Sequence, residues 1–149
     1  MSTITPVPQS VRNATLAVWA VLALLVLRAI LTVVFSDELV DAYVDGNETL
    51  KSLPREFAVD GAPRYTAVAI GVLVIGAVFA FAAANLGKAA RWARVVAIVF
   101  ASLSLLGVVV SVIAPTIPVL LVINVVVGLL SAAVIVLLCT GDANRFFAK

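Results

Sequence analysis

Two polar side chains interrupt long apolar runs of this 149-residue chain. Arg28 lies within AVWAVLALLVLRAILTVVF, and Asn124 lies within PVLLVINVVVGLL. A guanidinium keeps its positive charge at physiological pH, so Arg28 can bind an anion or an amide oxygen but does not exchange protons. Asn124 offers a carbonyl oxygen as acceptor and an amide nitrogen as donor. The chemistry that these residues could share is therefore recognition of a polar or anionic group.

The elements that must position these residues are membrane-spanning helices. The chain is 64% hydrophobic and 12% charged, with a mean hydropathy of +1.22. One small water-soluble core cannot bury so much apolar surface, so lipid must solvate most of it. A helix needs roughly 20 apolar residues to cross about 30 Å of hydrocarbon. Four segments qualify and predict an all-α membrane protein: 14–35, 65–86, 94–114 and 118–139.

The remaining segments connect these four spans. Because the connections after the second and third spans are short, we expect consecutive helices to be antiparallel neighbours in a four-helix bundle. Only the first connection, of about 30 residues, is long enough to form a separate layer, and its patterning predicts partly helical structure. The predicted connecting segments are a tail at 1–13, a loop at 36–64, turns at 87–93 and 115–117, and a tail at 140–149.

Acidic and basic residues lie in different connecting segments, and this separation predicts how the chain is oriented in the membrane. The loop 36–64 carries seven acids against Lys51, Arg55 and Arg64. By the positive-inside rule, we expect both termini and the turn 87–93 in the cytoplasm and the acidic loop outside. This predicts a multi-pass protein of the plasma membrane whose first partner is the lipid bilayer, and no nucleic-acid partner. The basic residues expected on the cytoplasmic side are Arg12, Lys88, Arg91, Arg94, Arg145 and Lys149.

Four acids open the outer loop and form a predicted acidic cap. Asp37, Asp41 and Asp45 recur every four residues, and Glu38 follows the first of them. We interpret them as a solvated helical face, with a basic partner as the alternative. A calcium loop is disfavoured, because the segment from Asp41 has Tyr43 at the third ligand position and Ser52 at the twelfth.

The depth of Arg28 suggests two interpretations. Its Cα lies about 10 Å inside the outer end of the first span, and Gly71, Gly107 and Asn124 lie at a similar depth in the others. In the first interpretation, Arg28 points into the bundle toward the Asn124 carbonyl, and the two glycines leave space for it. In the second, which we prefer on sequence alone, Arg28 extends outward to lipid phosphates or to the acids that begin at Asp37.

Small residues at intervals of four predict where the helices pack closely. Lipid tails are as apolar as a neighbouring helix, so contact between helices depends on small side chains that let the backbones approach. Each of three spans has such a row, and the members we expect at helix contacts are Gly76 and Ala80, Ala97 and Ala101, and Gly128 and Ala132.

The side chains needed for most catalysis are missing from the sequence. The chain contains no histidine, one cysteine, and no acid within any predicted span. Nucleophile–base pairs, soft-metal clusters and proton-coupled carboxylates cannot be assembled from this set. We therefore predict no enzyme, with no catalytic residue, no cofactor and no metal site.

Three motifs resemble those of a known group of proteins. A first span ending in FSDELVDA, a turn with RWARVV and the terminus LLCTGDANRFFAK are similar to small four-span integral membrane proteins of actinobacteria, which have no assigned function. This resemblance implies a plasma-membrane helical bundle of bacterial origin, and it implies no functional residue.

Two functions remain open. We favour an accessory, assembly or interaction subunit that binds other membrane protein subunits or a second copy of itself. The alternative is a small transporter or channel with a polar layer around Arg28 and Asn124. The other polar residues of the spans make only a thin trail, and serines inside helices usually bond to their own backbone. This trail consists of Thr32, Ser102, Ser104 and Ser111.

Overall fold

The computed structural model describes residues 6–113 and 117–148, and these residues form helices, turns and connecting segments without a strand. Four helices are long and four are short. The long helices are α1 Gln9–Val34, α5 Tyr65–Leu86, α6 Arg91–Ile113 and α7 Pro118–Leu138. The short helices are α2 Ser36–Asp45, α3 Glu48–Lys51, α4 Arg55–Asp60 and α8 Gly141–Phe147.

The four long helices are each apolar and long enough to cross a membrane. An apolar stretch in lipid must satisfy every backbone N–H and C=O internally, which a helix does within one segment. Pro118 begins α7 at a position where its missing N–H interrupts no helical hydrogen bond. The predicted all-helical fold with four long apolar helices is therefore confirmed.

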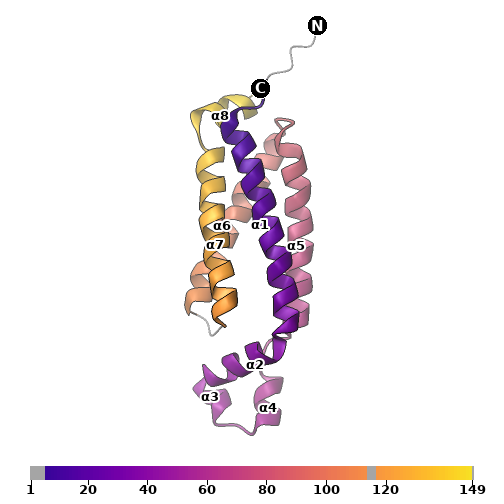
Figure 1. The fold of residues 1–149 in the computed structure, drawn as a ribbon, viewed down its shortest axis with the longest axis vertical. Coiled ribbons are helices and arrows are strands. Elements are labelled where there is room, and N and C mark those ends of the chain that lie inside the picture. Colours follow the sequence, from indigo (N-terminus) through magenta and orange to yellow (C-terminus); the bar gives the residue numbers. More distant parts are fainter. Residues whose placement is uncertain (1–5, 114–116, 149) are drawn as a thin grey trace.

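The long helices form a ring in which each contacts two others. α1 packs between α5 and α7, and α6 packs against α7 and α5. Figure 1 shows that consecutive long helices run in opposite directions along the bundle. The ring places α1 and α7 side by side, although they are far apart in the sequence. This pairing brings the helices of Arg28 and Asn124 together.

The two ends of the bundle carry different short helices. α2, α3 and α4, which we call the cap, lie together at one end, and α8 lies at the other end (Figure 1). Within the cap, the Asn47 side chain accepts hydrogen bonds from the backbone N–H groups of Thr49 and Leu50 and so begins α3. Thr140 begins α8 in the same way, by accepting from the N–H of Ala143 at 3.3 Å.

Several helices differ in length from the predicted segments. α1 begins at Gln9 inside the predicted tail, because Val11 packs into the core and extends the helix. α6 begins at Arg91 rather than at residue 94, and part of the predicted tail 140–149 forms α8. The predicted turn 115–117 and the last residue of the predicted span 94–114 lie largely outside the described residues.

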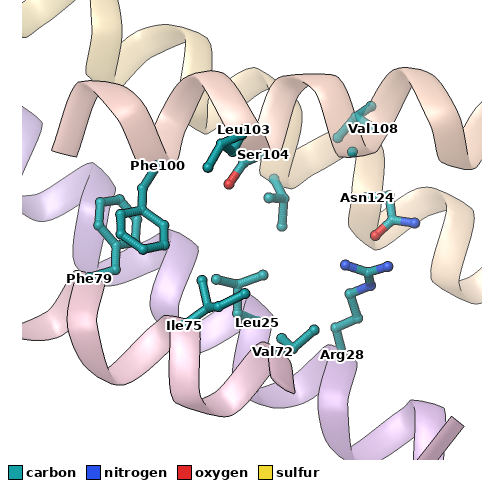
Figure 2. Close-up of a pocket in the computed structure, with 12 residues that line it drawn as sticks. Leu25, Arg28, Val72, Ile75, Phe79, Phe100, Leu103, Ser104, Val108 and Asn124 are labelled. Atoms are coloured by element: carbon teal, nitrogen blue, oxygen red, sulfur yellow. The ribbon is translucent and has the colours of Figure 1, made fainter. Parts of the chain in front are cut away.

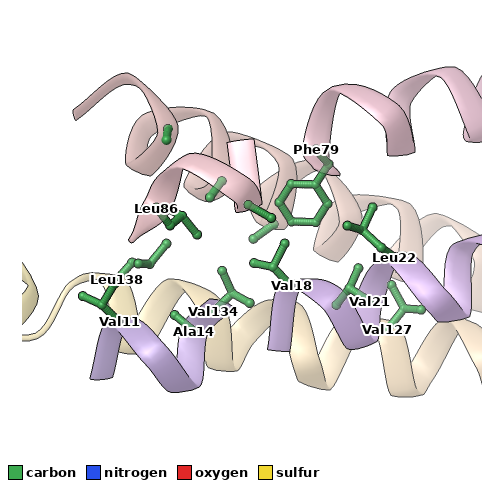
Figure 3. Packing of buried hydrophobic residues seen from close by; sticks show 14 of the residues in the cluster. Val11, Ala14, Val18, Val21, Leu22, Phe79, Leu86, Val127, Val134 and Leu138 are labelled. Atoms are coloured by element: carbon green, nitrogen blue, oxygen red, sulfur yellow. The ribbon is translucent and has the colours of Figure 1, made fainter. Parts of the chain in front are cut away.

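The most tightly packed part of the core lies toward α8. Its members come from the four long helices and α8 and are almost entirely inaccessible to solvent (Figure 3). The largest of these fully buried apolar side chains are Val11, Val18, Val21, Phe79, Leu86, Val134, Leu138 and Phe147. Close packing of such side chains leaves no path for a polar solute through this half of the bundle.

α8 closes this end of the bundle. The Arg91 guanidinium donates to the carbonyl oxygens of Phe147 at 3.0 Å and Ala148 at 2.8 Å. Arg94 donates to the Asn144 side chain and lies over the Phe147 ring, 5.5 Å from its centroid. Phe147 is 2% exposed, so this ring packs into the bundle and is not available to a lipid headgroup layer.

Candidate functional site

Arg28 and Asn124 meet inside the half of the bundle nearest the cap. Figure 2 shows the Arg28 guanidinium, from α1, directed toward the Asn124 amide on α7. Asn124 is 5% exposed and Arg28 is half-buried. Together with Gly107 of α6, they line two neighbouring cavities. The two polar residues therefore face the same internal space from adjacent helices.

The first of these, which we call the apolar cavity, has a volume of about 200 Å³. Arg28 and Asn124 lie at one end, and the stacked rings of Phe79 and Phe100, with centroids 5.3 Å apart, lie at the other (Figure 2). Aliphatic side chains from α1, α5 and α6 form most of the wall between the two ends: Leu25, Val72, Ile75 and Leu103. The cavity is thus polar at the Arg28–Asn124 end and mainly apolar along its length, where Ser104 of α6 is the one further polar residue of its described lining (Figure 2).

The second, which we call the polar cavity, has a volume of about 390 Å³ and lies between the first cavity and the cap. Besides Arg28, Gly107 and Asn124, several hydroxyl-bearing side chains line it: Thr32, Tyr43, Tyr65 and Ser111. The Tyr65 hydroxyl donates to the Leu39 carbonyl oxygen at 3.4 Å and so connects α5 to α2. The cap therefore closes part of this cavity.

Among the described residues, the side-chain polar groups of Arg28 and Asn124 have no hydrogen-bond partner, whereas two nearby hydroxyl groups bond to their own helices. Thr32 donates to the Arg28 backbone carbonyl at 2.7 Å, and Ser111 donates to the Val108 carbonyl at 2.8 Å. Within residues 6–113 and 117–148, neither the Arg28 guanidinium nor the Asn124 amide forms a hydrogen bond or ion pair. Both groups remain available to a ligand in the cavities.

Arg28 faces the bundle in this structure, and its preferred interpretation, an outward extension to lipid phosphates, stays a prediction. The side chain points toward Asn124 and lines both cavities instead of extending to the acids of the cap. Asp41 instead pairs with Arg55, with the Asp41 Oδ1 and Arg55 Nη2 atoms 2.5 Å apart. The other acids of the predicted cap set are exposed: Asp37, Glu38 and Asp45.

The two glycines predicted beside Arg28 differ in position. Gly107 lines both cavities, and a Cβ added to it would have no neighbouring atom within 4 Å. Both glycines are exposed, but Gly71 of α5 lines neither cavity. Counting residues gives the height of a position along a helix but not the direction in which it faces, so the prediction placed both glycines in one layer.

The predicted packing residues are used in two ways. Ala97 and Ala101 of α6 are buried, and a Cβ added to Gly128 of α7 would lie 3.0 Å from Val108. Gly76 and Ala80 of α5 are only half-buried, as is Ala132 of α7. The rows on α6 and α7 thus support contacts within the bundle, whereas the row on α5 remains partly open.

Metal-ligating side chains do not cluster in the described part of the chain: no three such residues come close enough to hold an ion. The sequence did not predict three contacts that the structure shows. These are the contacts of Arg91 and Arg94 with α8 and the ion pair of Arg55 with Asp41. The first two join residues about 50 positions apart, and nothing in their spacing indicates the partner.

Comparisons with models of protein families, with curated proteins and with solved structures found no match for this chain.

Proposed function

We propose that this chain is a non-enzymatic integral membrane protein that acts as an accessory or interaction subunit of a larger membrane complex. Its partner is a transmembrane helix of another protein, which packs against the seam between α1 and α5. The observation that carries this proposal is an open groove along that seam, with small side chains at its floor.

The groove consists of two hollows that share Trp19. The hollow nearer the middle of the bundle has a volume of about 440 Å³ and includes Gly76, Ala77 and Ala80. The hollow nearer α8 has a volume of about 680 Å³ and includes Ala84 and Gly87. Small residues let a second helix approach closely, and close approach is what holds helices together in lipid.

Charge at one end of the groove favours a particular partner. Arg12 is exposed and lines the hollow nearest α8. A partner helix with an acidic residue just beyond its apolar stretch would place a carboxylate beside this guanidinium. Two copies of this chain that face each other along the groove would instead bring two Arg12 guanidinium groups together. Their like charges repel, which favours a different protein over a second copy as the partner.

The proposed orientation follows from charge at the two ends. Arg12, Lys88, Arg91, Arg94 and Arg145 belong to the α8 end of the bundle, and most of the acids belong to the cap. By the positive-inside rule, this supports cytoplasmic termini, a cap on the outer surface and a location in a bacterial plasma membrane.

A transporter or channel is the second candidate. The two cavities around Arg28 and Asn124 favour it, because they could admit an anion or a polar solute. A conduit, however, also needs polar groups in the other half of the bundle. There the space is filled mainly by apolar side chains, with Phe79 at 1% exposure between the cavity and the rest of the core, and Ser131 of α7 is a buried polar residue among them.

The experiment compares particles purified from the native membrane in a mild detergent. The full chain is expressed as wild type, as Ala84→Phe in the groove, and as Val74→Phe on the exposed face of the same helix. The mass of each particle is measured by light scattering, and co-purifying chains are identified by mass spectrometry.

We expect a foreign membrane protein in fixed stoichiometry with the wild type and Val74→Phe, and its loss from Ala84→Phe. A particle that contains only this chain in all three preparations would contradict the accessory role. Flux of an anion through proteoliposomes that is abolished by Arg28→Leu would establish the transporter instead.

A further inference from the structure

We propose that Arg28 and Asn124 bind the anionic head of an acyl-chain amphiphile, a carboxylate or phosphate group, and that the apolar cavity accommodates the beginning of its tail. This ligand-binding site is separate from the α1–α5 groove and does not depend on the proposed partner. The proposal rests on the charge, the burial and the shape of the space between α1, α5, α6 and α7.

The positive charge of Arg28 would be stabilised by a bound anion. None of the four long helices contains an aspartate or glutamate. Within the described ranges, Arg28 forms no ion pair, and the acid Asp41 is paired with Arg55. A guanidinium among apolar helices is stabilised by a counter-charge with oxygen acceptors, and carboxylate and phosphate groups match its planar array of donors.

Asn124 provides the second polar contact. Its side chain is more than nine-tenths buried and directed into the same space as Arg28 (Figure 2), yet the residues that the structure describes offer it no hydrogen bond. Because Asn124 lines both cavities, a ligand there that accepts from its N–H group would give the amide a partner. Arg28 and Asn124 thus converge on one head group from α1 and α7.

The shape of the apolar cavity indicates an acyl chain rather than a small ion. From the polar end, its wall is formed by Leu25, Val72 and Ile75, and the Phe79–Phe100 pair closes its far end. A free inorganic anion would leave this wall without contacts, whereas methylene groups would fill it. A bound amphiphile therefore satisfies both ends of the cavity.

The opening between α5 and α6 lets a lipid-like molecule enter from the side. Ile75 of α5 and Leu103 of α6 both line the apolar cavity, and they are 51% and 57% exposed. α6 is also the least buried of the four long helices. A head group that enters along this opening reaches Arg28 without crossing the packed half near α8.

The test is a binding measurement on the purified full chain in neutral detergent. Four probes are compared by native mass spectrometry and by titration: oleate, dioleoylphosphatidylglycerol, oleyl alcohol and inorganic phosphate. The proposal predicts that oleate or dioleoylphosphatidylglycerol binds at one site, and which of them binds distinguishes a free fatty acid from a phospholipid as the source. Oleyl alcohol and phosphate should each bind at least about tenfold more weakly, because each lacks one half of the interaction.

Two pairs of variants locate the site. Arg28→Gln should weaken binding by at least about tenfold, whereas Arg12→Gln in the separate α1–α5 groove should leave it unchanged. Gly107→Leu adds a side chain to both cavities where there is open space, so it should block binding without disturbing the fold. Gly71→Leu makes the same change at an exposed position that lines neither cavity, and it should bind like the wild type.

Equal binding of oleyl alcohol and oleate would overturn the proposed role of Arg28, and phosphate that binds as tightly as the amphiphiles would overturn the role of the apolar cavity. Undiminished binding to Gly107→Leu would place the site elsewhere. If Arg28→Gln fails to fold, Gly107→Leu still tests whether the ligand binds in the two cavities.

Discussion

The core of the half of the bundle nearest α8 is filled by side chains, whereas the half nearest the cap has two cavities around Arg28 and Asn124. In the first half, Val11, Leu86 and Leu138 are almost completely buried. In the second, the polar groups of Arg28 and Asn124 face open space. Both halves of the four helices are mainly apolar, and the half nearest the cap differs by its open space and by the two polar residues that face it.

The contrast shows how one bundle can hold its shape and still offer a site. In lipid, stability comes mainly from close packing, because apolar surface is solvated by acyl chains whether or not a neighbouring helix covers it. Tight contacts in one half allow the other half to leave space unfilled. We interpret the packed half as the structural support and the hollow half as the place where a ligand binds.

The largest expected effect is a loss of packing at the boundary between the halves. Phe79→Ala should lower the free energy of unfolding by on the order of 2 kcal/mol, less than in a water-soluble core because lipid replaces the transfer contribution. Phe81→Ala on the same helix removes a ring that is 65% exposed, and should change it far less. Unfolding by sodium dodecyl sulfate, followed by circular dichroism, measures both. Equal effects would contradict the proposed difference in packing.

A second comparison uses two glycines that differ in surroundings. Gly128→Leu forces a side chain against Val108, which a Cβ at this position would already approach to 3.0 Å. We expect it to lower the free energy of unfolding by about 1 kcal/mol, less than Phe79→Ala does. The same unfolding assay measures this loss. A neutral result would mean that the contact between α6 and α7 can widen freely.

A smaller effect of opposite sign is expected at the cavity. Gly107→Ala adds a methyl group to open space and removes a flexible residue from the middle of α6. It should raise the free energy of unfolding by about 0.5 to 1 kcal/mol, because alanine favours the helix more than glycine does. A loss of stability here would show that the cavity is closed around Gly107 in the membrane.

The smallest effect is expected in the cap. The Arg55–Asp41 pair is largely exposed, and exposed ion pairs contribute about 0 to 1 kcal/mol. Arg55→Ala should therefore change global unfolding by less than about 0.5 kcal/mol. A large loss of stability would indicate that the cap supports the bundle rather than only covering one end of it.

The four long helices could be predicted from the sequence because lipid imposes a simple rule of length and hydropathy. Their ends were harder to place, since α1 and α6 extend beyond the apolar stretch through residues such as Val11 and Arg91 that contact other elements. Such tertiary contacts do not leave a periodic signal along the chain.

For the residues of the candidate site, the sequence predicted the position along the helix axis but not the side of the helix on which each residue lies. Residue counts placed Arg28, Asn124 and Gly107 at one level, and the structure brings these three together. The same counts included Gly71, which faces outward. They also did not reveal Phe79, Phe100 or Tyr65, because aromatic residues on an apolar helix give no sign of which ones line a cavity.

The most direct test of the account is the stability of Arg28→Leu with and without the amphiphile that binds the wild type, oleate or dioleoylphosphatidylglycerol. If Arg28 is a binding group, the variant without ligand should be at least as stable as the wild type, because an unpaired charge leaves the apolar interior. The amphiphile at a hundred times its dissociation constant should stabilise the wild type by about 2.7 kcal/mol and leave the variant unchanged. A less stable variant without the amphiphile, or equal stabilisation of both proteins by it, would contradict the account and make Arg28 a structural residue.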